Sequence, residues 1–256
     1  MATRSTAQQA TSSSSDHSLP ASSSAAKPRA TSTARPGNVW PLLVAEAVGT
    51  FGIVFAGCGA IMIDTLSHGQ ITHVGVGLVF GLIVAAMISA FGHISGAHFN
   101  PAVTLGFVLA RHFPLGRLLG YWGAQLLGAI VAAGTLRLLL GNVAHLGTTL
   151  PAGNPWQAAG FEFLLTAGLM IVIMAVATDT RAVGQAAAFA IGATVGLEAL
   201  FAGPISGASM NPARSLGPAL MSGTWTAQWV YVAAPLLGAA LGALLYRWLR
   251  VASSDS

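Results

Sequence analysis

Residues 94–102 read Ile94-Ser95-Gly96-Ala97-His98-Phe99-Asn100-Pro101-Ala102, and residues 205–213 read Ile205-Ser206-Gly207-Ala208-Ser209-Met210-Asn211-Pro212-Ala213. Seven of the nine positions are identical, at an offset of 111 residues. A second match lies upstream, since Glu46 followed by Gly49-Thr50 is echoed by Glu162 followed by Leu165-Thr166. The chain is therefore an internal duplication.

The composition around these repeats is that of a membrane protein. Of 256 residues, 54% are apolar and 7% are charged, and the mean hydropathy is +0.70. Soluble domains carry about 25% charged residues, so a water-soluble fold is excluded. The basic residues form no run that would bind nucleic acid. The single cysteine, Cys58, excludes an intramolecular disulfide and a cysteine-based zinc site.

Apolar runs long enough to cross a bilayer, which takes about 20 residues of helix, occur six times. We expect spans at about 39–63, 71–91, 118–140, 157–178, 182–202 and 226–249. Each copy of the duplication then holds three spans, so the second copy enters the membrane from the opposite side. The predicted fold is an all-α membrane protein with six transmembrane helices and two re-entrant half-helices in an inverted repeat.

The domain organisation follows from the same pattern. Residues 1–38 are rich in Ser, Thr, Ala and Pro and are expected to be a disordered tail. The membrane domain is expected over 39–250 (first repeat 39–140, linking loop 141–156, second repeat 157–250), with a short tail over 251–256. Most Lys and Arg residues fall on the side of the two termini, which predicts that both termini are cytoplasmic.

The two Asn-Pro-Ala segments predict the starts of the half-helices. Asn100 and Asn211 suit the N-cap, and Pro101 and Pro212 suit the first helical position, where the missing N–H costs nothing. Two half-helices from opposite faces meet near the membrane midplane, N-terminus to N-terminus. Their positive dipole ends and the Asn amide donors can bind water while disfavouring cations and protons. Ala102 and Ala213 complete the two motifs.

These motifs, with Glu46-Ala47-Val48-Gly49-Thr50, resemble the aquaporin or major intrinsic protein family over about residues 40–250. The sequences of these motifs are most similar to those of plant nodulin-type intrinsic proteins and their bacterial relatives. The resemblance implies a right-handed six-helix bundle with one pore per subunit and a homotetramer. It also implies a passive channel for water and small uncharged solutes that excludes ions.

A lone arginine in a membrane-embedded stretch is a functional candidate by default, and Arg214 is one. In the family, the matching arginine forms the outer constriction with three further residues, which fall here on Phe80, Ala199 and Ala208. Ala199 stands where water-selective members usually carry His. The expected constriction is therefore wide enough for glycerol-like polyols or neutral metalloid acids, with a mainly water-selective pore as the alternative.

Three acids lie inside the predicted spans, where an ionisable group is expensive. The resemblance implies that Glu46 and Glu162 accept hydrogen bonds from backbone N–H groups of the half-helix loops, with proton coupling as the rival interpretation. Glu198 has no acidic counterpart in the other repeat. Its role stays open between support of the outer loop and a variation in selectivity. His98 is expected in the cytoplasmic vestibule of the pore.

The alternative of another class is an ion-coupled secondary transporter, which also favours inverted repeats and broken helices. Its coupling site would have to come from the three buried acids. No nucleophile motif or metal-ligand spacing is present, so we predict no enzyme activity, no metal and no cofactor. The expected partners are water, small neutral solutes and the lipid of a plasma membrane, without nucleic acid.

Overall fold

The computed structural model describes residues 38–178 and 186–252. The expected tails fall almost wholly outside these ranges. The described residues form eight α-helices and two short 3-10 turns, with no strand among them. The helices are α1 Trp40–Leu66, α2 Thr72–Ser95, α3 Pro101–Leu109, α4 Leu118–Leu140, α5 Pro155–Thr178, α6 Ala186–Ser206, α7 Pro212–Ser222 and α8 Val230–Ala252, and the turns are η1 Leu115–Arg117 and η2 Ala144–Gly147.

Six of the helices are long and apolar enough to cross a bilayer, and the other two are short. With 9 residues, α3 measures about 14 Å at 1.5 Å per residue, roughly half of the hydrocarbon core. The short α7 has 11 residues. The expected fold, six transmembrane helices with two re-entrant half-helices, is confirmed.

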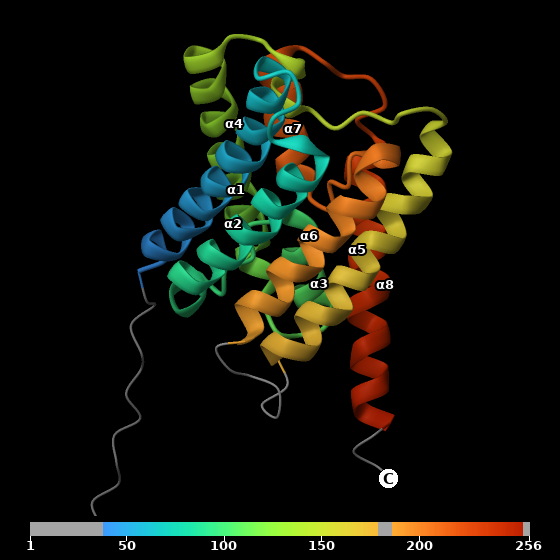
Figure 1. The fold of residues 1–256 in the computed structure, drawn as a ribbon. Helices are drawn as coiled ribbons and strands as arrows, with labels where there is room; N and C mark the ends of the chain where they lie inside the picture. The colour runs from blue at the N-terminus through green and yellow to red at the C-terminus, as the bar shows by residue number, and fades with distance from the viewer. Residues whose placement is uncertain (1–37, 179–185, 253–256) are drawn as a thin grey trace, which may run out of the picture. The chain divides into compact units, whose positions relative to one another are not determined.

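The packing of the helices follows the duplication. In the first repeat α1 packs on α4, and in the second α5 packs on α8. Each half-helix crosses to the other repeat, since α3 packs on α8 and α7 packs on α4. Figure 1 shows α7 in the upper part and α3 in the lower part of the bundle, between the long helices. The two half-helices therefore enter from opposite ends, as an inverted repeat requires.

The two repeats join through α2 and α6, which cross in very close contact. A Cβ atom added at Gly81 would lie 2.7 Å from the carbonyl oxygen of Gly192, and one added at Gly192 would lie 2.5 Å from the carbonyl oxygen of Gly81. Only glycine permits this approach of two helix backbones. The crossing fixes the distance between the walls of the pore on these two helices.

The structure corrects several span boundaries. We expected the fifth span to end at residue 202, but α6 continues through Pro204 to Ser206. Proline has no N–H, so the carbonyl of Leu200 loses its helical donor. The Nε2 atom of His73, on α2, lies 2.8 Å from that oxygen and replaces the missing donor. The last span begins at Val230 rather than near 226, and residues 182–185 of the fifth lie outside the described residues.

Candidate functional site

Each half-helix begins at an asparagine whose side chain caps it. The backbone of Asn100 is extended, and its Oδ1 accepts the N–H of Ala102 at 2.8 Å. The backbone of Asn211 is also extended, and its Oδ1 accepts the N–H groups of Ala213 at 3.0 Å and Arg214 at 3.3 Å. A proline at the first helical position follows each cap. Both helix starts predicted from the sequence are present.

The two caps also bind each other's loops. The Nδ2 atom of Asn100 donates to the carbonyl of Met210 at 2.7 Å, and the Nδ2 atom of Asn211 donates to the carbonyl of Phe99 at 3.0 Å. The N-termini of α3 and α7 therefore meet in the middle of the bundle. Each side-chain amide carries two N–H groups, so each keeps one further donor for a solute.

In the first repeat, Glu46 organises the loop before α3. Its carboxylate accepts the backbone N–H of His98 at 2.9 Å and of Phe99 at 2.6 Å. It also accepts the hydroxyl of Ser95 at 2.7 Å and the amide of Gln125 at 2.8 Å. Because these two backbone N–H groups bind the buried carboxylate, they are not available for the hydrogen bonds of a helix or a sheet.

In the second repeat, Glu162 does the same for the loop before α7. Its carboxylate accepts the backbone N–H of Ser209 and of Met210, each at 2.8 Å, and the hydroxyl of Ser206 at 2.9 Å. The contacts are those that the family resemblance implies. A carboxylate that accepts several hydrogen bonds from fixed donors is a structural anchor, so this geometry favours loop support over proton coupling.

Sequence reasoning missed two partners of these loops. The hydroxyl of Tyr121, on α4, donates to the carbonyl of Ser95 at 2.8 Å, and that of Tyr231, on α8, donates to the carbonyl of Ser206 at 2.6 Å. Each pair matches its counterpart in the other repeat, at offsets of 110 and 111 residues. That offset was the available signal, and a search for buried polar residues at the repeat spacing would have found both tyrosines.

Arg214 is the only arginine among the buried polar residues of the described chain, with 3% of its surface exposed. Its Nη1 donates to the carbonyl oxygen of Gly147 at 2.7 Å, and its Nε has no hydrogen-bond partner among the described residues. Its guanidinium carbon lies 4.9 Å from the centroid of the Phe80 ring. The charge is therefore held between a backbone carbonyl and an aromatic face, next to the cap of α7.

A cavity of about 800 Å³ connects these groups. Of the four expected constriction residues, Phe80, Ala208 and Arg214 line it, whereas Ala199 is buried but is not among its lining residues. Asn100 and Asn211 lie along its length. Most of the remaining lining is apolar: Ile53, Val84, Ile88, Val103, Phe107, Leu169, Ile173, Val176, Ile191 and Val195. A solute in the cavity thus finds a few hydrogen-bonding groups in a wall that is otherwise mostly apolar.

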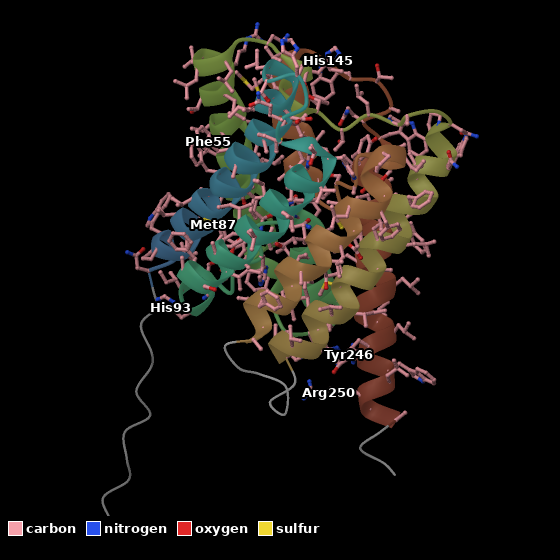
Figure 2. All side chains as sticks on the ribbon, in the orientation of Figure 1. Phe55, Met87, His93, His145, Tyr246 and Arg250 are labelled. Carbon is pink, nitrogen blue, oxygen red and sulfur yellow. The ribbon has the colours of Figure 1, made fainter. Side chains whose placement is uncertain are left out.

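His93, His112 and Thr178 also line the cavity. Figure 2 shows His93 and Arg250 at one end of the bundle and His145 at the other. Burial, together with the positive charges of Arg250 and Arg247, holds the pKa of His112 below its ordinary value. Both effects favour the neutral form of its imidazole.

The ring of His98 is largely buried at the edge of the cavity. It stacks on Phe107 with the ring centroids 4.5 Å apart, and its Nδ1 lies 3.2 Å from the hydroxyl of Thr104. The ring also contacts Phe113 and Tyr121. These contacts favour a packing role for the ring, and its expected place in the vestibule stays a prediction.

Glu198 lies over α5, where a Cβ added at Gly168 would be 3.2 Å from its Oε1. Its Oε2 has no hydrogen-bond partner among the described residues. In the first repeat, 111 residues earlier, Met87 occupies the matching position and packs over Gly52. Glu198 thus takes a place that its counterpart fills with an apolar side chain, and no hydrogen bond within the described part of the chain ties it to the outer loop.

Within residues 38–178 and 186–252, no cluster of three His, Cys, Asp or Glu side chains is placed to hold a metal ion. Besides backbone groups, the polar groups that line the cavity are the amides of Asn100 and Asn211, the guanidinium of Arg214, and the side chains of His93, His98, His112, Thr178 and Ser209. Such groups bind uncharged solutes by hydrogen bonds.

The sequence of the chain is similar to that of a known protein family. Residues 34–246 match the family model described as "Major intrinsic protein". The chain belongs to the major intrinsic protein family. Proteins of this family are channels for water and small neutral solutes, and this chain is such a channel rather than an enzyme.

Individual relatives agree with the family match. Aquaporin NIP1-1 of Oryza sativa subsp. japonica is 54% identical over 209 residues, which cover 81% of this chain and 74% of the relative. Nodulin-26 of Glycine max is 50% identical over 81% of this chain and 77% of its own length. Among solved structures, the aquaglyceroporin from Plasmodium falciparum matches with a TM-score of 0.78 and 25% identity, over 85% of this chain and 99% of that one.

Proposed function

We propose that this channel passes small polyols and neutral hydroxy acids as well as water, and that it excludes ions and protons. The observation that carries the proposal is that three sets of hydrogen-bond donors line one cavity. The amides of Asn100 and Asn211 face it from the meeting ends of α3 and α7, and Arg214 is fixed beside Phe80. The positive ends of both helices and the guanidinium oppose a cation at two successive points.

The solute range rests on the small constriction residues. Ala208 lines the cavity with only a methyl group, while Phe80 contributes an apolar face and Arg214 a donor cluster. Such an opening suits a solute with hydroxyls on one side and a carbon or flat face on the other. The likeness to an aquaglyceroporin structure supports passage of a polyol. A mainly water-selective pore is the alternative.

The experiment is stopped-flow light scattering on proteoliposomes, with water, glycerol, urea and boric acid as solutes. Fast osmotic shrinkage together with glycerol and boric acid entry supports the proposal. Water passage with neither solute crossing would leave the water-selective alternative. Solute uptake that depends on an imposed proton gradient would instead indicate a coupled transporter, for which the buried acids are the candidate sites.

We infer further that both termini are cytoplasmic and that the channel is a homotetramer in a plasma membrane. The start of α1 and the end of α8 lie at the lower part of the bundle in Figure 1. Arg247 and Arg250 lie near this end of α8, which agrees with the positive-inside rule. Four copies of the 25.9 kDa chain give about 104 kDa, so native mass spectrometry tests the assembly. Protease protection of tags on each terminus tests the orientation.

A further inference from the structure

The carbonyl that holds Arg214 belongs to a backbone segment in an unusual conformation. Ala144, His145, Leu146 and Gly147 have φ values of 46°, 50°, 56° and 68°, so four consecutive residues are left-handed and only the last is a glycine. L-residues rarely adopt this region, and never in runs without support from their surroundings. The position of the Gly147 carbonyl is therefore set by what this segment packs against.

The segment packs against α1 through Cys58. The Sγ of Cys58 lies 3.7 Å from the carbonyl oxygen of Gly147, within reach of a weak S–H hydrogen bond. A Cβ atom added at Gly147 would lie 2.8 Å from the Cβ of Cys58 and 3.2 Å from its Sγ, so the glycine rests directly on this side chain. The neighbouring Leu146 is fully buried in an apolar cluster that includes Val54, Cys58 and Met62.

One carbonyl oxygen thus connects two side chains from distant parts of the sequence. Gly147 accepts the thiol of Cys58 from one side and the Nη1 of Arg214, at 2.7 Å, from the other. No second acceptor for the guanidinium is present among the described residues. A shift of Gly147 is therefore transmitted to Arg214, and little else restrains that group except the Phe80 ring.

We infer that Cys58 is a positioning residue of the constriction: it seats the Gly147 carbonyl that holds Arg214, and the size of the side chain at position 58 thereby sets the selectivity of the pore. Cys58 touches no solute and acts only through Gly147 and Arg214. The inference rests on the proposed function, because it names a further determinant of the same constriction.

Three variants test it. Cys58→Val adds a branch against Gly147 and pushes its carbonyl, with Arg214, toward the opening. We expect the ratio of glycerol to water permeability to fall by about threefold or more, the effect of weakening one hydrogen bond of ordinary strength. Cys58→Ser keeps the size and the donor and should stay within about twofold of the wild-type ratio. Val54→Ala, in the same apolar cluster, is the control for a general packing defect.

A double-mutant cycle separates positioning from packing. If Cys58 acts through the arginine, Cys58→Val should have no further effect on the permeability ratio in an Arg214→Val background. A wild-type ratio in folded Cys58→Val would overturn the inference, as would an equal shift in Val54→Ala or an undiminished effect in the Arg214→Val background.

The outcome for the proposed function is read separately, from the wild type. Should wild-type protein pass no glycerol, the proposed solute range fails while the Cys58 inference is still tested by water permeability and proton leak. In that case, Cys58→Val must change the proton leak, and Cys58→Ser must leave it at the wild-type value. An unchanged proton leak and an unchanged water permeability in Cys58→Val would overturn the inference independently of the proposed function.

Discussion

The guanidinium of Arg214 lies over the ring of Phe80, 4.9 Å from its centroid. A cation over an aromatic face is attracted by the electron density of the ring. The same guanidinium donates to the carbonyl of Gly147, so it is held from two sides and is 3% exposed. The constriction therefore has a stationary positive charge that does not have to be ordered when a solute arrives.

Arg214→Val should raise the leak of protons and cations by about tenfold or more, because a unit charge a few ångströms away contributes on the order of 1 to 4 kcal/mol of repulsion at intermediate dielectric. Water permeability should persist, since the caps of α3 and α7 are unchanged. The leak is measured as dissipation of a pH gradient in proteoliposomes. Arg137→Val is the control, because Arg137 is exposed and binds the carbonyl of Met221, at the end of α7. An unchanged leak in folded Arg214→Val would remove this arginine from ion exclusion.

Mercurials should inhibit the wild type little, by less than about a fifth, since thiol reactivity requires access and Cys58 is the single cysteine and fully buried. Ala208→Cys supplies the positive control, because residue 208 lines the cavity. We expect that variant to lose most of its water permeability on addition of mercuric chloride and to recover it with a reducing thiol. Strong block of the wild type that Cys58→Ser abolishes would contradict the burial of Cys58.

Glu162→Gln should disrupt the loop before α7. The carboxylate accepts N–H groups at both oxygens, from Ser209 and from Met210, and a glutamine places an NH₂ against one of them. Leaving a buried donor unpaired costs about 1–3 kcal/mol. The measurement is thermal unfolding in detergent together with water permeability. Glu198→Gln is the matched control, because one of its carboxylate oxygens has no partner among the described residues, and it should be tolerated. Equal tolerance of both changes would remove the anchoring role of Glu162.

Ala199→His replaces a buried methyl group that does not itself line the cavity with a ring large enough to enter it. We expect the ring to narrow the opening and to cut glycerol and boric acid flux by about tenfold or more, a discrimination typical of a change in pocket size, while water flux survives. Phe201→His is the control on the same helix, because residue 201 is 63% exposed on the outside of the described bundle. Solute fluxes are compared by stopped-flow light scattering. Undiminished solute flux in folded Ala199→His would show that residue 199 does not border the narrowest point.

Most of the fold could be predicted from the internal duplication of the sequence. The repeat at residues 94–102 and 205–213 has strong local signals, because Asn and Pro at a helix start act through the backbone of the next few residues. The contacts of Glu46 and Glu162 were implied by the family resemblance, and the structure has both carboxylates bound to the loops. These features depend on short-range chemistry or on symmetry between the repeats.

Features that depend on tertiary packing were not predictable. The fifth span was expected to end at residue 202, but α6 continues through Pro204, and His73, from another helix, binds the carbonyl that the proline frees. The left-handed segment ending at Gly147 contains Ala144 and Leu146, residue types that give no local signal for positive φ. Its conformation depends on α1 and Arg214, which are distant in sequence, so only the structure could reveal it.

The most direct test of the account is a paired measurement on one preparation of wild-type proteoliposomes. Stopped-flow light scattering gives the permeability to water and glycerol, and a pH-sensitive dye in the same vesicles gives the proton flux under an imposed gradient. The account predicts fast water and glycerol permeation with a low activation energy and proton flux at the level of empty liposomes. Proton or cation flux well above that background in the intact protein would contradict the claim that the facing half-helices and Arg214 admit only uncharged solutes.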